Sequence, residues 1–297
     1  VNSCYGTIGP SQDAVDMFFM GNGLAINDPN SGYDETGFSA VENHCYDPDY
    51  KDKKTDQNIS NMYANREPRF YASVVYQGRS WFKKWMNGNP NYIVDFSAGG
   101  GNDLSNGDNV KTGYMLGKFK NRTVNHASGD TQSWKRVSII YRLAEFYLFY
   151  AEALNETDPS NPDIIKYIDM VRERAGIPGY QTMNDNGIKT GIIGNYDKQF
   201  DAIQHERYVE LYCEGQRYFD IRRWMICGDK DRIGCDQTRF YGMNMKGSKD
   251  KTPGEPTSYY TRTKVENRQW TDKLYLYPIH QNVIELANGR IPQNYGW

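Results

Sequence analysis

The chain has 297 residues, a formal net charge of −2 and a pI near 6.1, which argues against nucleic acid or an anionic membrane surface as its partner. It is hydrophilic overall, with a mean hydropathy of −0.81, yet it contains 24 tyrosines and 6 tryptophans. The most apolar run, residues 137–154, carries Arg142, Glu145 and Glu152, too much charge for a membrane span. Aromatic rings with polar tips suit an irregular core or a carbohydrate-like ligand equally well.

The first 60 residues show little periodicity and many Gly, Asn, Asp and Pro residues, which predicts loops with short elements. Within them, SQDAVDMFFMGNG predicts a brief helix that Ser11 caps, with Asp13 in its first turn. From Phe70 to Tyr76, β-branched and aromatic residues alternate and predict a short strand. The later stretch 97–113 is rich in Gly, Asn and Asp and is typical of a surface loop.

A helical block is predicted to start near residue 136. Residues 137–155 are apolar almost all round, which predicts a buried helix along which Arg142 and Glu145 can pair. A second helix is predicted to begin at Pro162 and to end at Gly176. Its apolar stripe consists of Ile164, Ile165, Ile168, Val171 and Ala175. Two helices joined by a short turn resemble a tetratricopeptide-type hairpin.

After a connecting loop expected at residues 179–197, the stretch 200–224 is predicted to be a single long helix. Gly215 lies near its middle, where a glycine is unfavourable unless another helix approaches closely. Charged residues interrupt the apolar arc, and unpaired charges are unstable there. We therefore expect a structural ion network formed by Arg207, Glu214, Arg217, Asp220 and Arg222.

Three glutamates on this helix, Glu206, Glu210 and Glu214, are the most tempting catalytic set. Residues four apart on a helix rise about 6 Å, which is compatible with the roughly 5 to 9.5 Å between glycosidase carboxylates. Successive turns nevertheless point their side chains the same way, and arginines lie among them, so an ion network is the preferred interpretation. No nucleophile-elbow, Walker or dinucleotide motif is present. We predict a protein that is not an enzyme, with no catalytic residue and no cofactor.

Metal sites are not predicted either. The five cysteines show no C-x-x-C spacing and the four histidines are scattered. Cys227 and Cys235 could close a small loop in an oxidising compartment, which the sequence leaves open. Asp47, Asp49 and Asp52 suggest calcium, but the glycine of an EF-hand turn is missing, so a solvated charged loop is preferred.

Aromatic platforms remain as candidates for ligand binding. Covering about 100 Å² of ring face at about 25 cal/mol/Å² contributes roughly 2 to 3 kcal/mol before ordering costs. Trp81 and Trp85 are four apart, so their rings share one face on a helical turn. Tyr76, Tyr92 and Trp134 complete the predicted set. A core or interface role is the alternative for each of them.

Several segments resemble the SusD/RagB family of outer-membrane-anchored nutrient-binding proteins. The run ERYVELYCEGQRYFDIRRW is similar to the family pattern E-R-x-x-E-L-x-x-E-G-x-R-x-x-D-L-R-R, with Ile221 in place of Leu. NREPRF resembles the N-R-D-P-R-F/L segment, with Glu67 in place of Asp, and SQDAVDMFFMGNG resembles the P-T-Q-E-L-V-D-x-F-x-M-x-x-G segment. The end of the chain resembles the L-Y-P-I-P and Q-N-P-G-Y/W motifs, with His280 and Tyr295 in place of the prolines.

The resemblance implies a mainly α fold, a SusD-like scaffold of tetratricopeptide-type helical repeats with long loops and short β-strands. The whole chain, 1–297, would form a C-terminal domain. It would comprise a loop-rich part (1–135), a helical-repeat part (136–225) and a loop and strand tail (226–297). Because one helical hairpin does not bury its own face, further repeats are expected in an N-terminal half absent from this chain.

The resemblance also implies a cell-surface location at the outer membrane, with a lipid anchor in that N-terminal half. The implied partners are the N-terminal half and a SusC-like TonB-dependent transporter. The implied function is capture of a glycan, or of a peptide in some relatives, for import without breaking a bond. Two alternatives remain: a glycoside hydrolase with dispersed carboxylates, and a helical-repeat module that binds another polypeptide.

Overall fold

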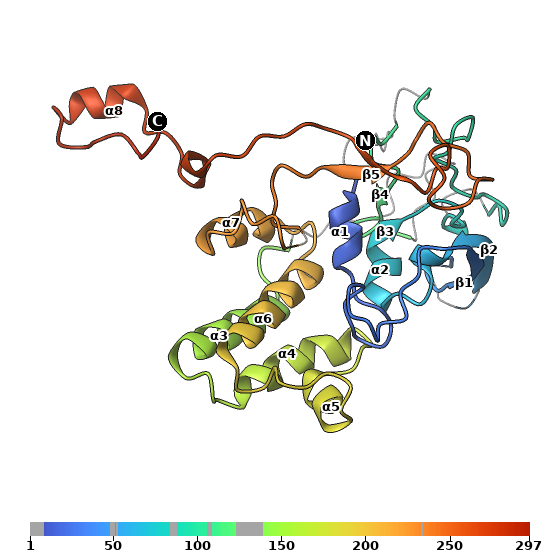
Figure 1. Cartoon of the computed structure of the whole chain (residues 1–297), viewed down its shortest axis with the longest axis horizontal. Coiled ribbons are helices and arrows are strands. Elements are labelled where there is room, and N and C mark those ends of the chain that lie inside the picture. The colour runs from blue at the N-terminus through green and yellow to red at the C-terminus, as the bar shows by residue number, and fades with distance from the viewer. Residues whose placement is uncertain are drawn as a thin grey trace.

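The computed structural model describes residues 9–47, 51, 53–83, 88–105, 109–122, 139–232 and 234–297. In chain order the helices and strands are α1 (Gln12–Met17), β1 (Phe38–Asn43), β2 (Lys54–Ser60), α2 (Pro68–Ser73), β3 (Val74–Val75), β4 (Met115–Leu116), α3 (Leu143–Thr157), α4 (Asp163–Arg174), α5 (Tyr180–Asp185), α6 (Tyr196–Glu210), α7 (Gln216–Arg223), β5 (Tyr241–Met243), β6 (Arg262–Lys264) and α8 (Gln281–Leu286). Figure 1 shows α3 to α7 as a helical block beside a loop-rich part that contains α1, α2 and the strands. The fold is mainly helical, as predicted.

The first helix starts where the sequence predicts. Ser11 has extended backbone angles, and its hydroxyl oxygen accepts a hydrogen bond from the amide of Ala14 at 3.3 Å. Asp13 lies in the first turn, where a carboxylate favours the positive end of the helix dipole. All six residues of α1 are buried, so this short helix is held by its surroundings more than by its own length.

The strand predicted between Phe70 and Tyr76 is wrong over most of its length. Residues 68–73 form α2, and only Val74 and Val75 are extended, pairing antiparallel with β4. Pro68 occupies the first turn of α2, where its fixed φ angle suits a helix. Burial of the aromatic side chains decides the conformation here, because strand propensity depends strongly on tertiary context.

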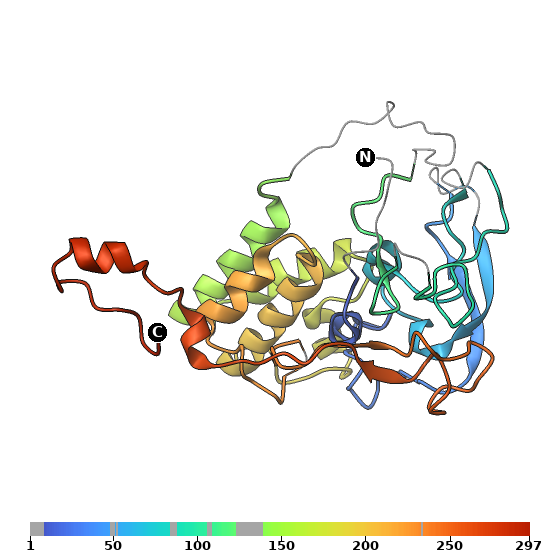
Figure 2. The same ribbon diagram turned by 90° about the horizontal axis from the view of Figure 1, so that it is seen from above.

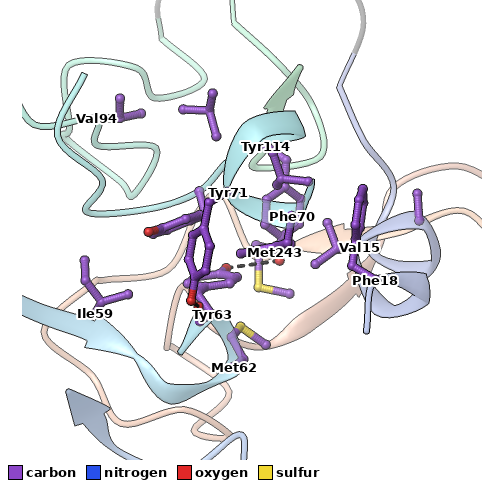
Figure 3. Close-up of a cluster of buried hydrophobic side chains, with 14 of the residues drawn as sticks. Val15, Phe18, Ile59, Met62, Tyr63, Phe70, Tyr71, Val94, Tyr114 and Met243 are labelled. Carbon is purple, nitrogen blue, oxygen red and sulfur yellow. Dashed lines mark hydrogen bonds between the residues drawn. The ribbon is translucent and has the colours of Figure 1, made fainter. Parts of the chain in front are cut away.

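An aromatic core fills the loop-rich part (Figure 3). The ring of Tyr63 stacks on that of Tyr76 at 4.8 Å between centroids and lies 6.2 Å from that of Phe70. The hydroxyls of Tyr63 and Tyr114 are 3.0 Å apart and form a hydrogen bond inside this core. Both phenols are fully buried, and burial raises their pKa well above the usual range. They therefore act as neutral hydrogen-bonding groups.

A second core joins α3, α4, α5 and α6. The predicted stripe of α4 is confirmed, since all five of its residues are buried. The predicted end is confirmed too, because the helix stops at Arg174 and Gly176 adopts a φ of +86°. Residues 180–185, expected in a loop, form α5 instead. The carboxylate of Asp169 accepts hydrogen bonds from the amides of Tyr180 and Gln181 at 2.6 and 2.9 Å, which supports the start of this helix.

The prediction that the helix now seen as α3 is buried all round is wrong for this chain. Among the described residues α3 packs against α4 and α6, and Phe146, Phe149 and Tyr150 on its remaining surface are 56%, 40% and 45% exposed. The predicted pairing of Arg142 with Glu145 is also not what the structure has. Arg142 pairs instead with Glu210, the last residue of α6, and with Glu214 in the turn that follows it.

The stretch 200–224 is not one helix. It divides into α6, which ends at Glu210, and α7, which begins at Gln216. Cys213 and Gly215 adopt φ angles of +58° and +89° in the connecting turn. A Cβ atom at Gly215 would meet nothing within 4 Å, so none of the described helices approaches this glycine. Its role is the left-handed turn that lets α7 change direction.

The C-terminal segment runs along the molecule, contributes β6, and then extends away from it. Figures 1 and 2 both place α8 apart from the helical block. Tyr277, Leu286 and Tyr295 in this segment are 71%, 84% and 85% exposed. Within the described ranges, every helix is too short or too polar to cross a membrane.

Candidate functional site

The predicted aromatic platforms occupy different environments. Tyr76 is fully buried, and its ring lies 4.8 Å from that of Tyr63 and 5.6 Å from that of Phe70, so protein covers it. Trp81 is 5% exposed and stacks on Phe82 at 4.7 Å. Tyr92 is partly buried against the same core and is the most accessible of the three. Trp85 and Trp134 lie outside the described residues, as do Cys4, Asp49 and Asp52.

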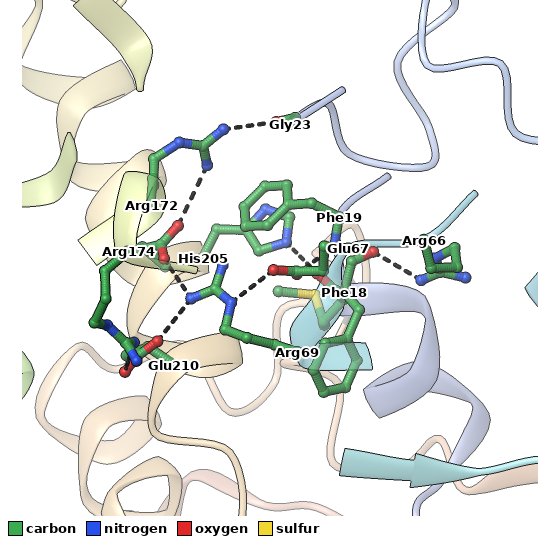
Figure 4. A network of polar contacts seen from close by, with 12 residues as sticks. Phe18, Phe19, Gly23, Arg66, Glu67, Arg69, Arg172, Arg174, His205 and Glu210 are labelled. Atoms are coloured by element: carbon green, nitrogen blue, oxygen red, sulfur yellow. Dashed lines mark hydrogen bonds and ion pairs between the residues drawn. The ribbon is translucent and has the colours of Figure 1, made fainter. Parts of the chain in front are cut away.

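The glutamates of α6 are held by arginines from several segments (Figure 4). Glu206, whose side chain is 0% exposed, accepts hydrogen bonds from Arg69 at 2.6 Å and from Arg172 at 3.3 Å. Glu210, 2% exposed, accepts from Arg69 at 2.8 Å and also pairs with Arg142 and Arg174. These arginines therefore neutralise both carboxylates, which do not face an open cleft.

The electrostatics of this cluster follow from burial and pairing. Burial alone would raise the pKa of Glu210, but the guanidiniums of Arg69 and Arg142 hold it below its usual value. Burial raises the pKa of Glu67, although Arg69 and a hydrogen bond from the amide of Phe19 at 2.8 Å both oppose that shift. Glu67 thus ties the end of α1 to α2, and Arg69 connects α2 to α6.

The other members of the expected ion network lie in two groups. Arg207 forms a bidentate pair with Asp220, with both N–O distances at 3.0 Å, and its guanidinium lies 4.3 Å from the ring centroid of Phe149. Glu214 pairs with Lys118 and with Arg142, each at 2.6 Å. Such pairs across α6, α7 and α3 fix the geometry of the helical block.

Arg217 and Arg222 have different contacts. Arg217 donates to the carbonyl of Gly234 at 3.0 Å and lies 4.3 Å from the ring centroid of Tyr208. Arg222 lies 3.6 Å from the ring centroid of Tyr218 and donates to its carbonyl at 3.0 Å. Cation–π contacts of this kind stabilise a guanidinium away from carboxylates.

A pocket of about 250 Å³ opens beside this network, between α1, the loop that follows it, α6, and the segment after α7. The lining residues are Asp16, Met17, Ala25, Ile26, Asn27, Asp201, Gln204, His205, Arg217, Asp231, Arg232 and Cys235. Arg232 crosses one side of the pocket and donates to Asp201 at 2.5 Å and to the amide oxygen of Gln204. The mixture of donors, acceptors and apolar carbon is typical of a small-molecule site.

His205 forms part of the pocket wall and is fixed on both sides. Its ring stacks on Phe19 at 4.1 Å between centroids, and its Nε2 lies 2.6 Å from the carbonyl oxygen of Met17. Burial lowers the pKa of His205 to about 4, although the carbonyl and the nearby Glu206 favour the charged form. The ring is therefore neutral at physiological pH, and Nε2 carries the proton that it donates to Met17.

Among the described residues, the thiols and the possible metal ligands form no further site. Cys227 donates to the carbonyl of Ile221 at 3.4 Å, and Cys235 accepts from Arg217 at 3.2 Å, so the two cysteines are unpaired. In the parts of the chain that the structure describes, no three His, Cys, Asp or Glu side chains are grouped to hold a metal ion.

A sequence model described as the SusD family matches residues 1–297. The chain belongs to the SusD family. The SusD-like protein P2 of Formosa agariphila is 37% identical over 82 residues, which cover 28% of this chain and 16% of that protein. The match over the whole length explains why the motif-like segments at both ends and in α6–α7 occur in one chain.

Solved SusD-like structures share the fold. The crystal structure of a SusD-like protein from Bacteroides fragilis NCTC 9343 matches with a TM-score of 0.68 at 28% identity, over 99% of this chain and 47% of that one. The structure of BT4246 matches with a TM-score of 0.72 at 24% identity, over 99% and 45% of the two chains. This SusD-family chain therefore spans about half the length of these solved relatives, and its helical block belongs to the helical-repeat scaffold that they share.

Sequence reasoning missed the pocket of this SusD-family chain. Its walls come from segments far apart in sequence, since the contact between His205 and Met17 spans 188 residues. Gln204 and Arg232 are also 28 residues apart, with no motif joining them. Spacing reveals a site only when its residues share one element, and here they do not.

Proposed function

We propose that this protein captures a glycan at the cell surface and presents it for import without cleaving it. The observation that carries the proposal is the family match over residues 1–297, because proteins of the SusD family are binding proteins. The many tyrosines and tryptophans suit a ligand with apolar C–H faces and hydroxyl rims. Of the aromatic candidates, Tyr92, Trp85 and Trp134 are proposed as ligand contacts.

The state of the α6 carboxylates supports binding over hydrolysis. A glycosidase needs two carboxyl groups that flank the scissile bond and exchange protons with it. Glu206 and Glu210 instead lie on one face of α6, enclosed by Arg69, Arg172 and Arg142. Carboxylates held in such pairs stabilise the scaffold and are poor candidates for proton transfer.

The proposal includes a location and partners. The protein would lie on the outer face of the outer membrane, anchored by a lipid on an N-terminal part not in this chain. It would work with that N-terminal half and with a SusC-like TonB-dependent transporter, to which it passes the glycan. No nucleic acid is involved, in keeping with the net charge of −2.

The test is a binding screen with analysis of products from the same samples. The protein is titrated with neutral oligosaccharides of glucose, galactose, mannose and xylose, and with short peptides, by isothermal calorimetry. Saturable binding of an oligosaccharide that is recovered intact supports the proposal. Shortened products would establish a hydrolase, and binding of peptides alone would establish peptide capture.

A further inference from the structure

The outer side of α3 is an apolar surface that the described part of the protein leaves uncovered. Leu143, Phe146 and Tyr150 are spaced three and four residues apart, so they share one side of the helix, and they are 62%, 56% and 45% exposed. The opposite side, where Leu148 and Ala151 are both 0% exposed, packs into the core that α3 shares with α4 and α6. The exposed residues therefore form a stripe along one helix, and such a contiguous apolar surface marks a site of protein contact.

The exposed side of the neighbouring helix has a different composition. Apart from Met170, the exposed side chains of α4 are charged, namely those of Lys166, Glu173 and Arg174. In an array of helical repeats each repeat contacts its neighbours, and a repeat at the end of the array presents a polar outer face. The exposed side of α4 suits contact with water, whereas that of α3 suits contact with a further repeat.

A second uncovered surface lies on the C-terminal arm (residues 272–297). Every residue of the arm is described, and none of them is buried. Hydrogen bonds within the arm define its shape. The side-chain amide of Gln293 pairs with the backbone N–H and carbonyl of Ile279 at 2.8 and 2.9 Å, and the indole of Trp297 donates to the carbonyl of Lys273 at 2.9 Å. The exposed apolar side chains of the arm include Tyr277, Leu286 and Tyr295. Because the arm has no core of its own, these side chains are removed from water only by contact with another surface.

The two surfaces lie on the same side of the molecule. Figures 1 and 2 place α3 and α8 on the side away from β1 and β2. The formal charges on the side chains of the arm cancel, with Asp272 and Glu285 against Lys273 and Arg290, so the arm suits an apolar partner better than a charged one.

The solved relatives indicate which partner this is. The SusD-like structure from Bacteroides fragilis matches over 99% of this chain but over only 47% of its own chain, so about half of that fold has no counterpart here. We propose that the outer side of α3 and the C-terminal arm form one docking surface, whose occupant is a helical hairpin from the N-terminal half of this protein. This inference rests on the proposed N-terminal half and does not depend on which ligand the protein captures.

The first experiment measures side-chain exposure in the full-length protein, with its N-terminal half. Phe146 and Phe119 are 56% and 57% exposed in this chain, and Leu286 and Leu104 are 84% and 39% exposed. Hydroxyl-radical labelling read by mass spectrometry should modify Phe146 more slowly than Phe119, and Leu286 more slowly than Leu104. Equal rates for the two phenylalanines, together with faster labelling of Leu286, would overturn the proposal.

Two variants test the same surface by stability. Phe146→Glu and Leu286→Glu each place a carboxylate on the docking surface, and glutamate is a good helix former, so α3 and α8 are retained. An unpaired charge buried under the hairpin is unfavourable, and each variant should lower the Tm of the full-length protein by more than about 5 °C. Thr182→Glu, the same change at an exposed site on α5, is the matched control and should shift Tm by at most about 1 °C. Equal Tm values for the wild type and all three variants would count against the docking surface.

Cross-linking and light scattering identify the occupant. Cross-links from Lys273 to lysines that precede this chain, in a monomer whose Phe146 is protected, support the proposal. Protection that appears only in a dimer assigns the surface to a second copy, and protection that appears only with phosphatidylglycerol vesicles assigns it to lipid; either result overturns the proposal.

Saccharide titrations keep this inference separate from the proposed function. Saccharide binding without protection of Phe146 and Leu286 overturns the docking surface alone. Protection without any saccharide binding supports the docking surface and overturns glycan capture alone.

Discussion

Two neighbouring regions along α6 differ in whether their buried polar groups have hydrogen-bond partners. Around Glu206 and Glu210 the side chains are 0% and 2% exposed, and each carboxylate accepts hydrogen bonds from at least two arginines. Gln204, two residues before Glu206 on the same helix, has a buried amide donor without an acceptor among the described residues. The polar groups of the first region are paired within the protein, whereas the second region retains an unpaired donor.

The pairing of buried polar groups therefore distinguishes the scaffold from the surroundings of the pocket. Buried charges are retained only when they are paired, and breaking such a pair is strongly destabilising. A buried donor left unpaired costs the protein about 1 to 3 kcal/mol. His205 lies between the two regions, because it lines the pocket and directly precedes Glu206 in the sequence. Variants in each region should therefore affect stability and binding differently.

The largest expected effect is that of Glu206→Gln. The change leaves Arg172, whose side chain is 0% exposed, without its carboxylate, and it weakens the hold on Arg69. Removing one partner of a buried ion pair typically destabilises by about 3 to 5 kcal/mol. Urea unfolding followed by circular dichroism measures the loss.

The control is the double variant Glu206→Leu with Arg172→Met, which removes both charges. It should recover much of the stability, because a hydrophobic pair of similar volume is often as stable as a buried ion pair. If the single variant loses less than about 1 kcal/mol, the region is solvated and the contrast with the pocket does not hold. Saccharide affinity of the folded single variant should remain close to that of the wild type.

The second effect is a dependence of stability on pH that comes from His205. Its folded-state pKa is lowered from 6.5 to about 4, chiefly by burial, so the unfolded chain binds the proton more readily. The contribution to stability is complete above pH 6.5 and is lost as the pH falls from 6.5 to about 4. With 1.36 kcal/mol for each pKa unit, this loss amounts to about 3 kcal/mol.

The measurement is the free energy of unfolding at pH 7, 6, 5 and 4 for the wild type and for His205→Gln. The variant is less stable at pH 7 but should show a flatter profile between pH 6.5 and 4, because glutamine does not titrate. His44→Gln is the matched control, since the side chain of His44 is 54% exposed. Equal slopes for the wild type and His205→Gln would contradict the assignment.

The sequence predicts the scaffold better than the site. A cap at Ser11, the stripe of α4 and its end at Gly176 are local patterns, and the structure confirms them. The break in 200–224 was missed because helical periodicity continues through Gly215, whereas its φ of +89° is a property of the turn. Local rules also failed at Phe70, where burial in the aromatic core overrides alternation.

The partners within the ion network could not be predicted from the sequence. Charged positions on an apolar arc indicate that partners must exist, but they do not name them. Arg69 lies 137 residues before Glu206, and Arg142 lies 72 residues before Glu214. The pocket is still harder to predict from the sequence. An unpaired amide such as that of Gln204 can be recognised only once all surrounding groups are placed.

The smallest expected effect on stability is that of Asp201→Ala at the pocket edge. The ion pair of Asp201 with Arg232 has an N–O distance of 2.5 Å, but the two side chains are 57% and 37% exposed. Exposed pairs contribute about 0 to 1 kcal/mol, so the free energy of unfolding should change by about 0.5 kcal/mol or less.

The buried pair of Glu206 and the exposed pair of Asp201 should therefore differ in how much stability their loss costs. Glu206→Gln should lower the free energy of unfolding by several kcal/mol, whereas Asp201→Ala should leave it nearly unchanged. Asp197→Ala, an exposed change in the first turn of α6, removes a carboxylate from the positive end of the helix dipole and should cost at most about 1 kcal/mol. If Asp201→Ala destabilises by more than about 1 kcal/mol, its carboxylate belongs to the scaffold, and the contrast between the buried and the exposed ion pairs of α6 fails at this residue.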